Sequence, residues 1–220
     1  VLQRPNPRVG PLQYLRDRGI SLRLVVANDW NASLRGGERT GMTNGGGANG
    51  GADFDLDKLL GIPGAKFHLG FARYYGHSVA ADDIGTYEKI QGYWYPYRQW
   101  QLAQFSWEQA FREQHLTLVV GRINATWQFN HSTYGCRFVN ASDCPYQITN
   151  TTGGFSGFPY VNWGGRLKYQ PDARYLSIGA FEINPNRRLN NGLDFSTRTA
   201  TGAMVPLEAG YETSFANDPY

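Results

Sequence analysis

Acidic and glycine-rich motifs are the features of this sequence that could carry chemistry. Asp53, Asp55 and Asp57 match the start of a calcium-binding loop, but the glycine and the distal glutamate of such a loop are missing. The glycine run 45–51 lacks the Lys-Ser/Thr pair and the helix of a phosphate-binding loop, so it indicates a flexible loop. No G-x-S-x-G sequence is present, which leaves an esterase or lipase as a weak alternative. These motifs therefore give little support for a calcium site, a phosphate-binding loop or a hydrolase, and we expect no metal.

Two cysteines, Cys136 and Cys144, are the only ones in the chain and lie eight positions apart in a polar, aromatic stretch. This spacing favours a local cross-link that stabilises a loop in an oxidising compartment. His131 lies five residues before the pair, so a zinc site is the less favoured alternative. No signal-peptide pattern follows Val1, and an exported protein is expected to have lost its signal.

The composition favours a protein wall between water and an apolar phase. Aromatic residues make up 15% of the 220 residues and glycines number 27, whereas charged residues reach only 18%. Lipid-facing positions of a transmembrane barrel reject charge, and its interfaces collect aromatic residues. No apolar run has the ~18 residues of a membrane helix, and a net charge of +3 without basic runs gives no support for nucleic-acid binding. On composition alone, a soluble β-sandwich or lectin is an equal alternative.

Alternation of apolar and polar residues predicts strands along most of the chain. Residues 1–19 are irregular, apart from a short helix that would end at Gly19. Strands are predicted at 20–26, 53–60, 66–75, 101–111, 116–120, 163–169, 175–183 and 206–215. The polar stretch at about 123–160 has no sustained period and is predicted to be a long loop, and such loops are usually functional. Short turns that alternate with long loops are typical of outer-membrane barrels.

The order of several motifs resembles the OprB-type carbohydrate-selective porin family. The chain contains G-I-S-L-R-L at 19–24, D-F-D-L-D-K-L-L-G-I-P-G-A-K-F-H at 53–68 and F-S-W-E-Q-A-F-R-E-Q-H-L-T-L-V-V-G-R-I at 105–123. C-R-F-V-N at 136–140, W-G-G-R-L at 163–167, F-E-I-N-P-N at 181–186 and N-G-L-D-F at 191–195 follow in the family's order. Each motif is weak alone, but their order over nearly the whole chain makes the resemblance specific.

The resemblance implies an all-β, antiparallel transmembrane β-barrel in the outer membrane of a Gram-negative bacterium. Because the family's barrel has about sixteen strands, this chain is expected to supply the N-terminal half, with residues 20–220 in one barrel domain. An open half-barrel in lipid would leave ~5 unpaired groups on each strand edge, at a cost of tens of kcal/mol. The missing C-terminal half, outer-membrane lipid and a sugar are therefore the expected partners, and a homotrimer is an open expectation.

The resemblance also implies a pore for diffusion of carbohydrates, with monosaccharides such as glucose as the expected substrates. A soluble or surface carbohydrate-binding β-protein is the alternative, and solubility without detergent would distinguish it. A pore selects by the charge, the hydrogen-bonding groups and the width of its lining. The polar residues assigned to the lumen side of the strands are Arg23, Asp55, His68, Glu108, Arg122, Arg166, Lys168, Glu182, Glu208 and Glu212.

Six residues are selected as pore-lining or sugar-binding candidates, mostly from the family motifs. They are Arg122, Arg166, Glu108, Glu208, Trp163 and Trp127. Arginine offers a rigid fork of donors and glutamate offers acceptors, a combination that suits vicinal sugar hydroxyls. The two arginines and Glu108 are expected to point into the lumen, from strands whose other face carries Trp107, Val120 and Leu167. Cys136 and Cys144 resemble the family's loop cysteines, so their disulfide is expected in an extracellular loop that folds toward the pore.

Overall fold

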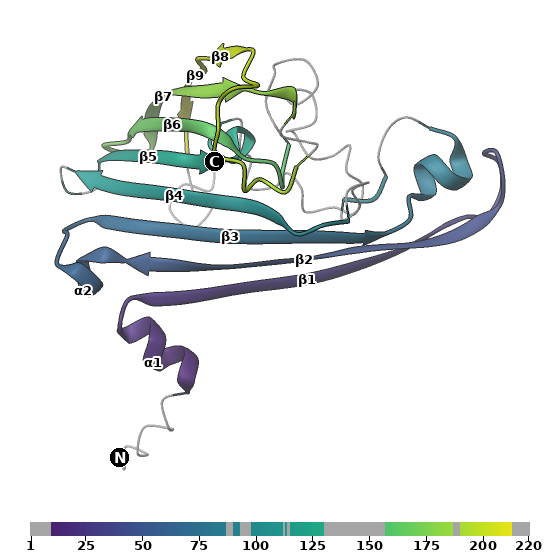
Figure 1. The fold of residues 1–220 in the computed structure, drawn as a ribbon, viewed down its shortest axis with the longest axis horizontal. Coiled ribbons are helices and arrows are strands. Elements are labelled where there is room, and N and C mark those ends of the chain that lie inside the picture. Colours follow the sequence, from purple (N-terminus) through teal and green to yellow (C-terminus); the bar gives the residue numbers. More distant parts are fainter. Residues whose placement is uncertain are drawn as a thin grey trace.

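One antiparallel sheet dominates the computed structural model, which describes residues 10–86, 90–92, 98–111, 113, 115–129, 157–186 and 190–212. The sheet has nine strands (Figure 1), and consecutive strands pair with one another from β1 to β8. Strand β9 pairs with β7, along a different stretch from the one that β8 uses. The predicted all-β, antiparallel meander is therefore confirmed.

The predicted strands occur in the predicted order, whereas β8 and the helical elements after α1 were not predicted. The strands are β1 (Ile20–Ser33), β2 (Gly41–Asp55), β3 (Ala65–Gly76), β4 (Gln101–Phe111), β5 (Leu116–Ile123), β6 (Asn162–Tyr169), β7 (Arg174–Ile183), β8 (Gly202–Met204) and β9 (Leu207–Tyr211). The helical elements are α1 (Pro11–Asp17), α2 (Leu56–Leu60), the π-helical turn η1 (Ala80–Ile84) and the 3-10 turn η2 (Ala125–Trp127). None of the helices in the described residues is both long and apolar enough to cross a membrane.

The two ends of the sheet differ in the length of their connections (Figure 1). Helices α1 and α2 lie at the end where β4 and β5 are joined by a tight hairpin, in which Phe111 pairs with Leu116. The long connections after β3, β5 and β7 all start at the opposite end, where β1 also turns back into β2. We call these the short-turn end and the long-loop end.

The two faces of the sheet differ in chemistry. One face exposes a broad set of large apolar side chains: Leu22, Leu24, Val26, Trp30, Val120, Leu167, Leu176, Ile178, Leu207 and Tyr211. The other face carries charged side chains and two buried clusters, one around Val119, Ile123 and Phe181, and one around Ala72 and Tyr74. Exposed apolar area of this extent is suited to lipid rather than to water. We call the apolar face the outer face and the other the inner face.

Strand β2 corrects two predictions. The glycine run 45–51, predicted to be a flexible loop, lies within β2 and pairs with both β1 and β3. Tyr74 of β3 lies against Gly47, where an added Cβ would be only 2.5 Å from the Tyr74 ring. The strand predicted at 53–60 ends at Asp55, because the Asp55 carboxylate accepts the backbone N–H groups of Asp57 at 3.2 Å and Lys58 at 3.3 Å and so caps α2.

Other sequence-based expectations fall partly or wholly outside the described residues. Helix α1 occupies the position of the short helix expected before Gly19. Most of the long loop predicted at 123–160 lies outside the described residues, and so do Cys136 and Cys144. The division into residues 1–19 and one barrel domain at 20–220 stays a prediction.

Candidate functional site: a charged belt on the inner face

Charged side chains cross the inner face in the half of the sheet nearer the short-turn end. We call this set the charged belt: Arg23, Asp53, Lys66, His68, Glu108, Arg166, Lys168, Glu208 and Glu212. The strand register produces it, since Asp53 of β2 lies opposite His68 of β3, and Lys66 of β3 lies opposite Glu108 of β4. Residues two apart on a strand share a face, so each strand can add two members to the belt.

The first part of the belt is a chain of ion pairs across four strands. The Arg23 guanidinium lies 2.7 Å from the Asp53 carboxylate, and His68 Nδ1 lies 2.6 Å from the same carboxylate. On its other side, His68 Nε2 lies 3.6 Å from the Glu108 carboxylate. Lys66 Nζ lies 3.7 Å from Glu108. Positive and negative groups thus alternate, which keeps the local net charge low while presenting many donors and acceptors.

The second part of the belt extends this alternation from β6 to β9. Lys168 Nζ lies 3.2 Å from the Glu212 carboxylate, and the Tyr175 hydroxyl donates to Glu208 at 2.8 Å. Arg166 donates to the backbone oxygen of Gln128 at 3.2 Å. The Arg166 Nε–H is buried and has no hydrogen-bond partner among the described residues. This part of the belt therefore contains one buried donor that the described residues leave unsatisfied.

Besides the Tyr175 ring, which Lys168 Nζ approaches to 4.3 Å, the Trp127 ring lies beside the belt on the inner face. Trp127 belongs to η2, directly before Gln128, and is 50% exposed. Its ring packs against Phe158 with centroids 5.5 Å apart, and Phe158 in turn contacts Tyr74 at 6.5 Å. Trp127 is therefore packed against Phe158 and remains half-exposed.

The predicted orientation of Arg122 is wrong. Arg122 follows Val120 by two residues and so shares its face, and the register pairs Arg122 directly with Phe105 and Trp163. All of these lie on the outer face. Arg122 is nevertheless fully buried, because the segment that follows β7 covers it. The Arg122 guanidinium donates to the backbone oxygen of Asp194 in this segment at 2.7 Å.

Trp163 lies on the outer face with Arg122. Its indole N–H donates to the backbone oxygen of Phe195 at 2.9 Å, and its ring packs against the Phe195 ring at 5.9 Å. Glu182, which was also assigned to the lumen side, follows Phe181 of the inner face and so lies on the outer face, where its carboxylate accepts the backbone N–H of Trp163 at 3.2 Å. Asp55 is used as the cap of α2.

Of the six selected residues, the structure thus brings Glu108, Arg166 and Glu208 together in the belt and places Trp127 beside it. Sequence reasoning missed Asp53 and Lys66. Both follow from parity alone, because Asp53 is two residues from Asp55, and Lys66 is two residues from His68, on the same strands.

Comparisons with known proteins agree with this architecture. Residues 39–220 match the model of the carbohydrate-selective porin, OprB family. Porin B of Pseudomonas aeruginosa is 29% identical over 211 residues, which cover 90% of this chain and 46% of Porin B. The high-pH structure of Pseudomonas putida OprB superposes with a TM-score of 0.85 at 28% identity, covering 91% of this chain and 50% of that one.

The low-pH structure of Pseudomonas putida OprB shares the fold, with a TM-score of 0.57 at 21% identity over 90% of this chain and 51% of its own. The chain therefore spans about half the length of the relatives it matches, as the resemblance implied. The family indicates a channel rather than an enzyme, and the expected location in a Gram-negative outer membrane is confirmed. Since the family model covers well over half of the residues, the chain belongs to the carbohydrate-selective porin, OprB family.

Proposed function

We propose that the full-length protein is an outer-membrane porin through which carbohydrates diffuse, with monosaccharides such as glucose as substrates, and that this chain supplies half of the pore wall. The observation that supports the proposal best is the contrast between the two faces of one sheet. The outer face exposes apolar side chains, whereas the inner face carries the charged belt. A wall with these two faces separates lipid from a polar lumen.

The belt suits a neutral sugar because each sugar hydroxyl both donates and accepts hydrogen bonds. The carboxylates of Glu108 and Glu208 accept, while the guanidinium of Arg166 donates. Alternating charges keep the local potential low, so binding stays weak enough for release, which conduction requires. Trp127, half-exposed beside the belt, offers a ring face to the apolar side of a sugar. No bond is made or broken, so we expect neither catalysis nor a cofactor.

The proposal includes the partners that half a barrel needs. The edges of the sheet must pair with the C-terminal half, because unpaired backbone groups in lipid cost several kcal/mol each. Outer-membrane lipid covers the outer face. A homotrimer, and a disulfide between Cys136 and Cys144 in an extracellular loop, stay predictions.

Ion current through the full-length protein in planar bilayers tests the function. Glucose should reduce the current reversibly, and Arg166→Gln or Glu108→Gln should weaken this block about tenfold, as expected when a charged hydrogen bond to the sugar is lost. Arg174→Gln is the matched control, since the Arg174 side chain forms an exposed pair with Asp172 at the short-turn end. The proposal would be overturned if sugars left the ion current unchanged, or if the protein were soluble without detergent. The second result would favour a carbohydrate-binding β-protein.

A further inference from the structure

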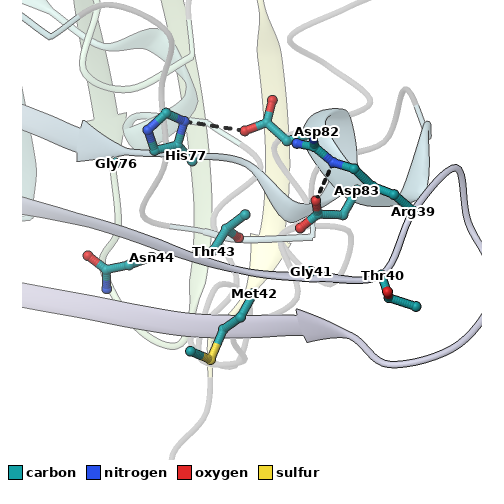
Figure 2. Close-up of a pocket in the computed structure, with 10 residues that line it drawn as sticks. All are labelled: Arg39, Thr40, Gly41, Met42, Thr43, Asn44, Gly76, His77, Asp82 and Asp83. Atoms are coloured by element: carbon teal, nitrogen blue, oxygen red, sulfur yellow. Dashed lines mark hydrogen bonds and ion pairs between the residues drawn. The ribbon is translucent and has the colours of Figure 1, made fainter.

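A polar pocket of about 480 Å³ lies at the long-loop end of the sheet, away from the charged belt (Figure 2). Gly41 and Thr43 form its floor and lie on the same face of β2 as Asp53, because even numbers of residues separate them. Asp53 is ten residues further along β2 than Thr43, which corresponds to about 33 Å. The pocket therefore lies on the inner face, at the opposite end of the lumen from the belt.

Ion pairs hold the pocket in a fixed shape. The Arg39 Nε–H donates to Asp83 Oδ1 at 2.8 Å, and the Arg39 backbone N–H donates to the Asp83 backbone oxygen at 3.0 Å. These two bonds tie the connection between β1 and β2 to η1. On the other wall, His77 Nδ1 lies 3.4 Å from the Asp82 carboxylate. Figure 2 shows Thr43 and these two pairs on one side of the hairpin, with Met42 directed to the other.

Two buried oxygen atoms in the pocket have no hydrogen-bond partner among the described residues. They are Asp83 Oδ2 and Thr43 Oγ1. The Asp83 side chain is only 4% exposed, whereas Arg39 is 64% exposed. Buried polar atoms in folded proteins nearly always have a partner, so such a pair of atoms points to a ligand that supplies hydrogen-bond donors.

The charges of the pocket select the class of ligand. Two carboxylates face one guanidinium and the imidazole of His77, so the pocket does not favour an anion. A polyhydroxylated neutral molecule can donate to Asp83 Oδ2, exchange a hydrogen bond with Thr43 and accept from the exposed N–H groups of Arg39. The described residues contain no group of three or more His, Cys, Asp or Glu side chains arranged to hold a metal ion. A neutral polyol therefore fits better than a divalent cation.

We propose that this pocket is a saccharide subsite that captures sugars entering the lumen from the long-loop end, before they reach the charged belt. This inference rests on the proposed function, since it requires that sugars pass through the lumen. It adds a second, separate site to the path.

Gly41 offers a sharp test. An added Cβ at Gly41 would lie 2.7–2.9 Å from the atoms of the Asp83 carboxylate, so Gly41→Ala fills the pocket beside its key acceptor. Thr43→Val removes the hydroxyl and preserves the branched shape, which suits a strand and should leave folding intact. Gly50→Ala is the matched control, because a methyl group added there, also in β2, would be 3.6 Å from its nearest neighbours.

The measurement is the association rate of glucose, taken from current noise in oriented channels of the full-length protein with sugar added to one side at a time. We expect Gly41→Ala and Thr43→Val to lower this rate at least threefold for sugar added at the long-loop end. The rate from the other side and the conductance without sugar should not change, and Gly50→Ala should behave as the unmodified protein.

The outcomes separate the subsite from the proposed function. If glucose never affects the current of the unmodified protein, the function itself is wrong, and the subsite fails with it. If glucose blocks, but neither variant differs from Gly50→Ala or both sides change equally, only the subsite is overturned. If Ca²⁺ alters the current of the unmodified protein but not of Asp83→Asn, while the two variants leave the glucose rate unchanged, the pocket is a cation site and the saccharide assignment is wrong.

Discussion

Arg122 of β5 and Arg166 of β6 lie on neighbouring strands, yet they occupy opposite faces of the sheet. Arg122 is on the outer face, fully buried, and donates to the backbone oxygens of Val161 and Asp194 at 3.0 and 2.7 Å. Arg166 is on the inner face, close enough to Glu108 and other belt carboxylates to interact electrostatically with them. The same side chain therefore serves as an anchor for a surface segment in one place and as part of a polar lining in the other.

The surroundings of the two arginines explain the difference. The Arg122 guanidinium lies 5.3 Å from the centre of the Phe195 ring and 5.8 Å from the Trp163 ring, so aromatic faces shield its charge from the apolar surroundings. The Arg166 guanidinium instead interacts electrostatically with the carboxylates of the belt. The partners of an arginine, rather than its place in a motif, thus indicate whether its charge can act on a solute.

The largest effect should follow from replacing the outer arginine. Arg122→Met removes the donor of the buried Val161 carbonyl and of the partly buried Asp194 carbonyl, and we expect a loss of about 2–4 kcal/mol in the free energy of unfolding. Sugar block and ion selectivity of the protein that still folds should be nearly unchanged. Urea-induced unfolding of the full-length protein in detergent measures the first effect, with Arg166→Met as the matched comparison. A stable Arg122→Met protein with weakened sugar block would contradict the assignment of Arg122 to the outer face.

Replacing the inner arginine should alter ion selectivity rather than stability. Arg166→Met removes one positive charge from the lumen, so the ratio of cation to anion permeability should rise about twofold at low salt. The shift should shrink at 1 M salt, where the screening length falls to about 3 Å. Reversal potentials in a salt gradient report the ratio. An unchanged reversal potential at low salt would show that Arg166 does not face the conducting path.

A smaller effect should come from the titration of His68 between Asp53 and Glu108. Imidazoles change charge between pH 5 and 8, so a rise in pH through this range removes one positive charge from the belt and should increase cation selectivity modestly. His68→Gln should abolish this dependence, while His115→Gln, in the turn before β5, should retain it. Asp172 cannot contribute, because hydrogen bonds from Arg174 hold the pKa of Asp172 at about 2. A pH dependence that persists in His68→Gln would assign it to another group.

The smallest effect should come from Lys66. Its pair with Glu108 is long, at 3.7 Å, and the lysine side chain is more than half exposed. Exposed pairs of this kind contribute little, so Lys66→Gln should change the free energy of unfolding by less than ~0.5 kcal/mol. Heat-induced unfolding measures this change. If Lys66→Gln lowered the free energy of unfolding as much as Arg122→Met, the predicted difference in stability between inner-face and outer-face charges would be wrong.

Alternation along the chain was sufficient to predict most strands and seven of the nine charged members of the belt, because a strand with one apolar face has a period of two. The same rule, applied strictly, would have corrected two errors. Val120 and Arg122 are two residues apart and must share a face, whereas Trp163 and Arg166 are three apart and must not. The glycine before Arg122 and the nearness of Trp163 to the long loop do not determine the face on which these side chains lie, whereas parity does.

Other features depend on contacts that alternation cannot encode. The backbone oxygen of Asp194, which accepts from Arg122, is 72 positions away in the chain. The Asp83 carboxylate, which accepts from Arg39, is 44 positions away. From the sequence alone, the glycine run in β2 is typical of a loop. In the structure, the rings of Tyr74 and Tyr75 on the neighbouring strand fill the space that side chains at Gly47 and Gly46 would need. These pairings need the strand register first, so the pocket at the long-loop end could not be predicted from the sequence.

The meander order of the strands also has a consequence for assembly. From β1 to β8, each strand pairs with the strand that follows it in the chain, so each pairing closes only the loop between them. The entropy lost on closing a loop grows slowly with its length, and local contacts favour fast folding. The sheet can therefore grow one hairpin at a time as the chain enters the membrane. Joining β1 to a strand outside this sheet closes a far longer loop, and we expect that step to limit the rate of barrel formation.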